Sequence, residues 1–303
     1  MSNSNLKVVK HSHDPASISV ESTFNPNELQ SSYVRKSRNG KIRTAALCKS
    51  RPIINWLLLF LIVITVFTFG FVNFGNINFV QAIPRALENI GFMFGQPLFR
   101  HVSFMSALSG LWTTFSLGVL ATIFGAVIAF LVSLICARNL SNPRVSTVVR
   151  GIVSAIRAVP SILMVLIFTI GVGLGGTAAV AGLSIASAAF LVKAYSESIE
   201  ELDPGTIEAL RATGAGFWQI VFQAVLPATI GYLVAWTFLR FEQNFINAIA
   251  MGAAAGAGGI GFDLFMAGSF YFDMRELGAI TYMIMFSVIL LELIATRIKA
   301  KVK

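Results

Sequence analysis

About six long apolar runs, separated by shorter polar segments, dominate the hydrophobic pattern of this chain. At 1.5 Å per residue, an uncharged run of about twenty residues forms a helix long enough to cross a hydrocarbon core of roughly 30 Å. The pattern therefore predicts an all-α, polytopic membrane protein. The predicted transmembrane helices are 53–72, 107–137, 151–172, 177–195, 228–250 and 277–296.

Two polar regions precede the second run. Residues 1–50 show no apolar periodicity, which predicts a disordered tail before a membrane domain of residues 51–303. Residues 73–106 mix apolar and charged positions, and we expect part of this segment to form an amphipathic helix on the outer surface. The tail ends in a basic cluster, which favours a cytoplasmic anchor beside the first span. The cluster consists of Arg35, Lys36, Arg38, Lys41, Arg43, Lys49 and Arg51.

The amino-acid composition of the chain is also typical of a protein that lies in a lipid bilayer. The chain is 55% hydrophobic and only 12% charged, against roughly 25% charged residues in a soluble domain. The net charge is +9, but the basic residues stand in the tail and at the ends of the apolar runs. We therefore expect no nucleic-acid partner. Because Lys and Arg concentrate in 1–50, 138–150, 196–227 and the C-terminus, these parts are predicted to be cytoplasmic, with both chain ends inside.

Catalytic and metal-binding patterns are not found in the sequence. Cys48 and Cys136 form no CxxC pair, and His11, His13 and His101 have no ligand spacing on a helix. Neither a Ser/His/Asp set nor a carboxylate pair suggests catalysis. From these patterns we expect that this chain is not an enzyme and that it binds no metal and no cofactor itself.

The most informative segment is 196–227, which is longer than a simple connection between spans requires. A Pro-Gly break is followed by a short helix that we expect Thr206 to cap and Gly214 and Gly216 to end. A second amphipathic piece, 217–225, leads into the next span. An exposed helix of this kind suits docking into a groove on another protein, and the alternative is an interfacial loop without a partner.

This segment resembles the EAA motif of binding-protein-dependent ABC permeases. The motif is Glu-Ala-Ala, then Gly after three residues, then a hydrophobic-x-Leu-Pro ending. Leu210 replaces the second Ala and Ala224 replaces the usual Ile. In that family the segment is the coupling helix, which inserts into a cleft of the ATPase subunit. The resemblance assigns ATPase coupling to Glu208, Ala209, Leu210, Arg211, Gly214, Leu226 and Pro227.

Further sequence motifs, from about residue 157 to the C-terminus, resemble those of the phosphonate-type permeases. The matching stretches are RAVPSILMVLIF, IEELDPGTIEALRATGA, RFEQN and GAGGIG. The chain departs from the family in 246–251, where a basic residue is expected. The resemblance implies a type I ABC importer permease fold in a bacterial inner membrane. It also implies a second permease copy, two ATP-binding subunits that hold ATP and Mg²⁺, and an external substrate-binding protein.

Charged and polar residues inside predicted spans are candidates for the substrate path. An arginine facing lipid costs several kcal/mol, so Arg157 and Arg240 should face a bundle interior or water. They either line a path for an anionic phosphonate, pair with Glu242 to fix helix packing, or close a gate. The glycine-rich stretch 252–261 lacks the Gly-Lys-Ser/Thr of a phosphate loop. Its small residues predict a re-entrant segment or a tightly packed turn near the mouth of the path. The full candidate set is Arg157, Arg240, Glu242, Asn244, Gly256, Gly258 and Gly259.

Two alternatives to phosphonate import remain open. The first is an ABC permease for another solute, such as phosphite, a phosphate-like anion or methionine, whose permeases share parts of these motifs. The second is an ion-coupled secondary transporter, a class that often shows inverted repeats and broken helices. The sequence has no clear repeat, and a coupling loop would have no purpose there.

Overall fold

The computed structural model describes residues 35–36, 42–43, 51–71 and 78–302, which belong to two separate units. The N-terminal unit, Met1–Ile77, contains an antiparallel pair of two-residue strands, β1 (Arg35–Lys36) and β2 (Ile42–Arg43), and the helix α2 (Arg51–Phe71). Helix α2 confirms the first predicted span. Most of the predicted tail lies outside the described residues.

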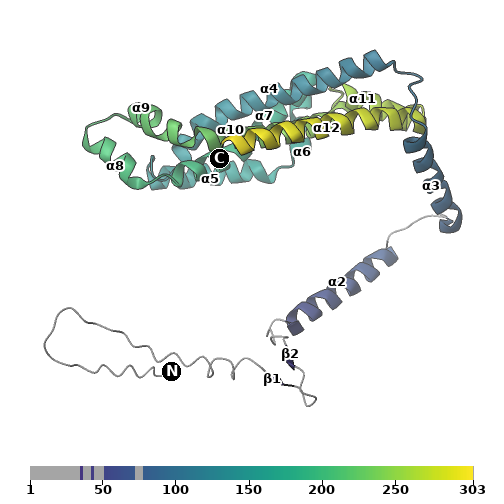
Figure 1. Ribbon diagram of the computed structural model, residues 1–303, viewed down its shortest axis with the longest axis horizontal. Coiled ribbons are helices and arrows are strands. Elements are labelled where there is room, and N and C mark those ends of the chain that lie inside the picture. Colours follow the sequence, from purple (N-terminus) through teal and green to yellow (C-terminus); the bar gives the residue numbers. More distant parts are fainter. Residues whose placement is uncertain (1–34, 37–41, 44–50, 72–77, 303) are drawn as a thin grey trace. The chain divides into compact units, whose positions relative to one another are not determined.

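The main unit, Asn78–Lys303, is all-helical in its described part (Figure 1). Its elements are α3 (Phe79–Gly95), α4 (Phe104–Cys136), α5 (Pro143–Ala158), α6 (Ser161–Val172), α7 (Gly176–Glu200), α8 (Pro204–Ala212), α9 (Phe217–Ile220), the π-helical turn η1 (Val221–Val225), α10 (Leu226–Ala254), α11 (Ile260–Phe265), the π-helical turn η2 (Met266–Phe270) and α12 (Met274–Val302).

Among the described residues, 5 helices are long and apolar enough to cross a membrane, or up to 6 if one bent pair counts as a span. The bent pair is α5 and α6, which meet at 88°. The prediction of one continuous helix over 151–172 is therefore wrong. Pro160 has no N–H to donate and forces the preceding residue out of the helical region, so Val159 is extended at φ −80° and ψ 121°.

The core of the main unit forms where α4, α7 and α10 pack together, with α6 against α7. Small residues allow these helices to approach closely, as is usual in membranes. A Cβ on Gly182 of α7 would lie 2.5 Å from the Cα of Val165 in α6. On Gly125 of α4 it would lie 2.6 Å from the Cβ of Ser187 in α7. Glycine is therefore required at both crossings.

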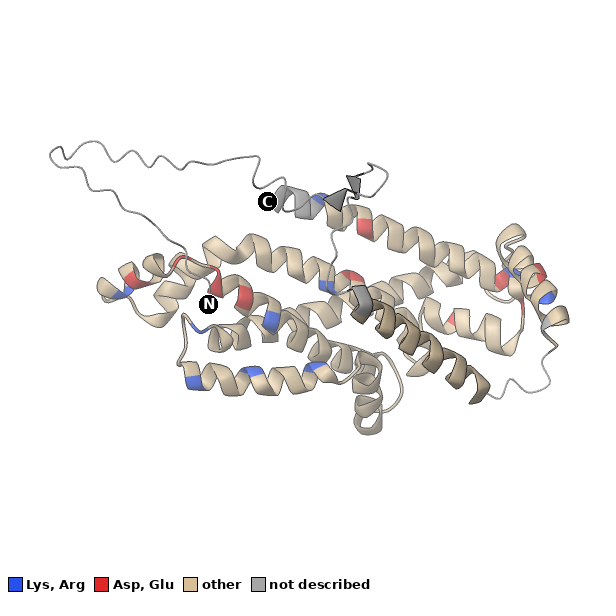
Figure 2. Cartoon of the chain, turned by 90° about the horizontal axis from the view of Figure 1, so that it is seen from below, with Lys and Arg blue, Asp and Glu red and all other residues tan. Residues whose placement is uncertain are grey.

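Charged residues of the main unit gather mostly towards the two ends of the long helices (Figure 2). One end carries α8 and the α4–α5 connection. The other end carries α3, the α3–α4 connection and the start of α12 (Figure 1). This distribution leaves an apolar band between the ends, as expected for helices that cross a bilayer.

We expect Gly182→Ala to destabilise the protein, because the new methyl group would overlap the backbone of α6. Overpacking of this kind costs about 1–3 kcal/mol. Gly171→Ala, in α6, is the matched control, because a Cβ there meets nothing within 4 Å. Thermal unfolding in detergent should show a lower midpoint for Gly182→Ala and an unchanged or higher one for Gly171→Ala. Equal midpoints would contradict the tight α6–α7 crossing.

Candidate functional site

The predicted coupling segment forms a helix that begins at an aspartate. The Asp203 side chain caps α8 by accepting a hydrogen bond from the backbone N–H of Gly205 at 3.0 Å. The prediction that Thr206 is the cap is therefore wrong, because the Pro-Gly pair forms the first turn of the helix instead of preceding it. At the other end, Gly214 has φ +81°, the left-handed conformation that favours glycine.

Helix α8 lies on the body of the protein through one face only. Ile207 is buried at 2% exposure in a cluster with Leu134 and Ile199, from α4 and α7. Leu210 packs against the same cluster, so its replacement of the motif's second alanine fills a contact inside the chain. Glu208 and Ala209 lie on the opposite face and are exposed. The segment thus presents a fixed, outward-facing helix surface.

Hydrogen bonds attach α8 to the ends of two long helices. The Arg211 Nη2 donates to the carbonyl of Asn139, just beyond α4, at 3.0 Å. The Asn139 side chain in turn donates to the carbonyl of Ile199, near the end of α7, at 2.7 Å. These two hydrogen bonds therefore link α8 to the ends of both α4 and α7.

Glu200 extends this connection to α5. Its Oε1 accepts from the backbone N–H of Arg138 at 2.6 Å and from Nη2 of Arg150 at 2.5 Å. Arg150 Nε also donates to the carbonyl of Cys136 at 2.9 Å. We call this set of contacts the docking-loop joint. Its members are Arg138, Asn139, Arg150, Ile199, Glu200 and Arg211.

The end of the motif leads directly into a spanning helix. Leu226 is half-buried and Pro227 is exposed in the first turn of α10. Pro227 has no N–H, and its ring would meet the carbonyl four residues earlier, so the chain forms the wider π-helical turn Val221–Val225 just before it. Helix continues from Phe217 to Ala254, which makes the fifth predicted span longer than expected.

Arg240 lies in the interior of the main unit, only 8% exposed. Its Nε donates to the Ser187 hydroxyl at 3.0 Å and its Nη1 to the Gln243 side-chain oxygen at 3.1 Å. The guanidinium also lies over the ring of Phe190, 5.2 Å from its centroid. Among the described residues, no carboxylate forms an ion pair with Arg240, and Glu242 is half-buried without such a pair.

The contacts of Arg240 extend into a buried polar network across three helices. The Asn244 amide donates to Ser187 Oγ at 2.8 Å and to Thr122 Oγ1 at 2.9 Å. Thr122 donates to the carbonyl of Gly118 at 2.7 Å. Asn244, Ser187 and Thr122 are all buried. One polar cluster therefore joins α4, α7 and α10 at the core.

Arg157 occupies a different environment from Arg240. It is exposed in the last turn of α5, beside a cavity of about 110 Å³ that Arg150, Lys193 and Glu197 also line. The two arginines predicted for one path are thus placed in two settings, one near the docking-loop joint and one in the core.

The glycine-rich stretch forms a compact turn between α10 and α11. Gly256, Gly258 and Gly259 all have positive φ, at 59°, 75° and 73°. A Cβ on Gly259 would lie 2.3 Å from the Thr114 hydroxyl oxygen of α4. That hydroxyl accepts the backbone N–H of Ile260 at 3.1 Å. The turn is therefore packed against α4.

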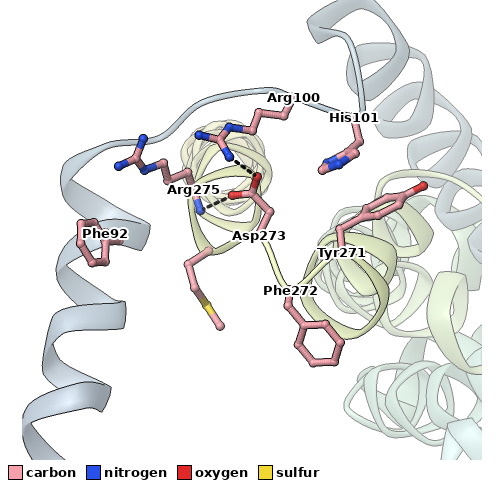
Figure 3. A pocket seen from close by; sticks show the side chains of 8 residues that line it. Phe92, Arg100, His101, Tyr271, Phe272, Asp273 and Arg275 are labelled. Atoms are coloured by element: carbon pink, nitrogen blue, oxygen red, sulfur yellow. Dashed lines mark hydrogen bonds and ion pairs between the residues drawn. The ribbon is translucent and has the colours of Figure 1, made fainter.

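A cleft of about 500 Å³ opens at the end of the main unit remote from α8 (Figure 3). Arg100 forms an ion pair with Asp273 at 3.4 Å, and the His101 ring stacks on Tyr271 at 4.1 Å. Arg275 lies over Phe92, which belongs to α3. The cleft thus joins α3, the α3–α4 connection and the start of α12.

A buried carboxylate beneath this cleft closes the α3–α4 connection onto α12. Glu276, fully buried, accepts through Oε1 the backbone N–H groups of Arg100, His101 and Val102 at 3.3, 2.9 and 2.7 Å. Its Oε2 lies 2.8 Å from His101 Nδ1. His101, Asp273 and Glu276 each offer one possible metal-ligand atom, and these atoms lie within 4.8 Å of one another. The Glu276 carboxylate already accepts the hydrogen bonds given above, and the Asp273 carboxylate already pairs with Arg100. The arrangement is a structural tie.

Sequence reasoning missed several residues that the structure brings to these places. Ser187 and Thr122 gave no signal, because isolated hydroxyl residues are common inside apolar helices. Arg150 and Glu200 were identifiable only as charges near the ends of two spans. An exposed aromatic group beside α8 was also missed, and it consists of Phe217, Trp218 and Phe222.

Comparison with known proteins gives a consistent family. Residues 129–302 match the family described as "Binding-protein-dependent transport system inner membrane component". The phosphate-import permease protein PhnE of Mycolicibacterium smegmatis is 36% identical over 153 residues, which is 50% of this chain and 29% of that protein. The phosphite transport system permease protein PtxC of Stutzerimonas stutzeri is 34% identical over 180 residues, 59% of this chain and 65% of that protein. The chain thus spans less than two thirds of the length of these relatives.

A solved structure resembles about two thirds of the chain. The inward-facing MetNI methionine ABC transporter has a chain that superposes with a TM-score of 0.59 at 26% identity. The match covers 65% of this chain and 95% of that one. The all-α, type I importer permease fold predicted from the sequence is therefore confirmed.

The docking-loop joint should protect the α8 segment from proteolysis. Glu200→Ala removes the acceptor of Arg138 and Arg150, and charge-assisted hydrogen bonds contribute about 1.5–3 kcal/mol. We expect trypsin to cleave after Arg211 at least about fivefold faster in this variant, because cleavage follows local opening. Glu197→Ala is the control, since Glu197 forms only an exposed pair with Lys193 at 3.6 Å. Equal cleavage rates in both variants would contradict the joint.

Proposed function

Because the chain belongs to the family of binding-protein-dependent transport system inner membrane components, we propose that it is the permease subunit of an ATP-driven importer. Its several apolar helices make it a multi-pass membrane protein. The observation that carries the proposal is α8, a short helix held against α4 and α7 by Ile207 and Arg211, with Glu208 facing outward. Such a helix adds little to the hydrophobic core, and most of its side chains form an exposed surface on which another protein can bind.

In this proposal, the outward face of α8 enters a groove on a cytoplasmic ATPase subunit. Glu208 supplies a polar contact, Ala209 allows close approach, and Gly214 shapes the end of the docking helix. The docking-loop joint carries displacement of α8 into α4, α5 and α7. ATP-driven closure of two ATPases then rocks the helices between outward and inward access. ATP and Mg²⁺ bind the ATPases and not this chain.

The complete importer contains a second permease copy, two ATP-binding subunits and an external substrate-binding protein. Both ends of the chain lie on the cytoplasmic side, where the basic segments concentrate. The domain boundary between the tail and the permease lies near residue 50. Family membership and the charge pattern support these proposed assignments.

The proposed substrate is a phosphonate or a related phosphorus oxyanion. An anion inside the bilayer needs compensating positive charge from a group that keeps its proton. Arg240 supplies such a charge, and two of its contacts are to neutral side chains, Ser187 and Gln243. Two relatives are named for phosphate and phosphite, which agrees with this class. Helix movement during transport would let the guanidinium meet the anion.

A methionine-like solute is the second candidate, favoured by the structural similarity to the MetNI methionine ABC transporter. A zwitterionic amino acid carries its own positive charge, so its transport has less need of Arg240. The two candidates therefore differ in how strongly uptake depends on this one side chain.

The turn after α8 should matter for ATPase association through its backbone. Gly214→Ala places a Cβ at φ +81°, which costs about 1–2 kcal/mol. We expect roughly five- to thirtyfold weaker co-purification of the ATPase, with normal membrane levels. Gly216→Ala is the matched control, because Gly216 has φ −72° and a Cβ there would meet only the Gln219 side-chain oxygen, at an ordinary contact distance of 3.6 Å. Unchanged association in Gly214→Ala would contradict the docking role of this turn.

Uptake by the reconstituted importer, with its ATPase and binding protein, tests the function and the substrate together. We expect accumulation of a phosphorus oxyanion only with ATP, and not with an ion gradient alone. Arg240→Gln should lower uptake at least about tenfold while ATPase association persists, because a charge-assisted contact contributes about 1.5–3 kcal/mol. Arg240→Lys should retain part of the uptake.

Assembly of the same variants separates the path role from a structural role. If Arg240 instead only fixes helix packing, through Ser187, Gln243 and Phe190, Arg240→Gln should assemble poorly and uptake should fall in proportion to assembly. A loss of uptake that is fully explained by lost assembly would contradict the path role of Arg240. Methionine uptake that survives Arg240→Gln would favour the second candidate.

A further inference from the structure

Helix α3 carries an apolar stripe that the main unit leaves largely exposed. Its residues follow a spacing of three and four, which places them on one face of the helix. They are between 41% and 82% exposed. Polar side chains, including Arg85 and Glu88, lie on the opposite face. The stripe consists of Val80, Ile83, Leu87, Ile90 and Phe94.

Contacts with α12 fix the direction in which this stripe faces. The ring of Phe92 lies 5.7 Å from the guanidinium of Arg275, in the first turn of α12. The ring of Phe94 packs edge-on against Tyr282, with centroids 5.7 Å apart, and Tyr282 donates to the carbonyl of Phe94 at 2.8 Å. Tyr282 lies two turns, or about 10 Å, further along α12 than Arg275. A Cβ on Gly278, between them, would meet the carbonyl of Met93.

The order of these contacts orients the two faces of α3. Phe92 and Phe94 are two positions apart and so lie on nearly opposite sides of the helix. Phe94, a member of the stripe, meets the deeper part of α12, whereas Phe92 meets its beginning. The stripe therefore faces along α12 towards the middle of that spanning helix, and the polar face points away from it.

Helix α3 also runs steeply across the direction of α12 (Figure 1), and Figure 3 shows it from the side at the start of α12. Since Met274–Arg297 is apolar enough to cross a membrane, a helix lying across its first turns runs along the membrane surface. Met285 and Phe286, three and four residues beyond Tyr282 and so on the same face of α12, are also exposed.

We propose that α3 is an interfacial anchor whose stripe lies in the headgroup and acyl-chain boundary of the leaflet where α12 begins. The occupant of this face is lipid, because the stripe points to bilayer depth and its polar face points to water. The proposal requires only that α12 spans the membrane. It does not depend on the substrate or on ATPase coupling, so failure of either leaves it standing.

Spin labels can measure the depth of the two faces in the full-length chain. Single cysteines are placed at Leu87 and, as the matched control, at neighbouring Glu88, in a background of Cys48→Ser and Cys136→Ala. The protein is reconstituted in vesicles of phosphatidylethanolamine and phosphatidylglycerol. Accessibility to oxygen and to a water-soluble nickel complex then reports the depth of each label.

The Leu87 label should lie about 5–10 Å below the phosphates, and the Glu88 label should be accessible to nickel. Nickel accessibility of both labels would overturn the proposal, because the stripe would then face water. A Leu87 label shielded from oxygen and nickel alike would also overturn it, since a second copy or another protein would cover the stripe. Labels at Ile83 and Arg85 repeat the comparison should the first pair reduce folding.

Discussion

The junction of α4, α7 and α10 depends on hydrogen bonds in a place where water cannot replace them. Ser187, Asn244 and Thr122 satisfy one another across the three helices. Gly125 allows the backbones to approach closely enough for these short side chains to meet. The same junction holds the guanidinium of Arg240. The close packing of the helices, the hydrogen bonds of the buried polar side chains and the position of the buried guanidinium therefore depend on one another. A change to any one of them affects the other two.

The two ends of the main unit lie away from this junction, and each is held by its own set of hydrogen bonds. At one end, hydrogen bonds to backbone carbonyls hold α8 against the helices while leaving one face free. At the other, Glu276 gathers three successive N–H groups and fixes the entry to α4. Both ends are thus attached through backbone groups. Hydrogen bonds to backbone groups fix the position of α8 relative to the end of α7, and the position of the α3–α4 connection relative to the start of α12.

The spans were predictable from sequence because each depends on length and lack of charge, which are properties of a single segment. The short helix and turn in 196–227 were predictable from the Pro-Gly break and from the glycines that follow it, whereas the coupling role of this segment is a proposal. The break at Pro160 was missed because a proline inside an apolar run either kinks a span or ends it, and local sequence does not separate the two. The Ser187–Asn244–Thr122 contacts and the Arg150–Glu200 pair depend on which helix faces meet, and no single segment encodes that. Asp203 instead of Thr206 became the cap because Pro204 starts the helix.

The break between α5 and α6 has a consequence for what can surround it. The last carbonyls of one helix and the first N–H groups of the next have no partner in their own helix. Hydrocarbon offers none, and leaving such groups in lipid costs several kcal/mol each. Helix α6, Ser161–Val172, is also too short to cross a core of roughly 30 Å alone. The elbow at Pro160 must therefore border water or protein, which excludes lipid from direct contact with the backbone at this point of the helix bundle.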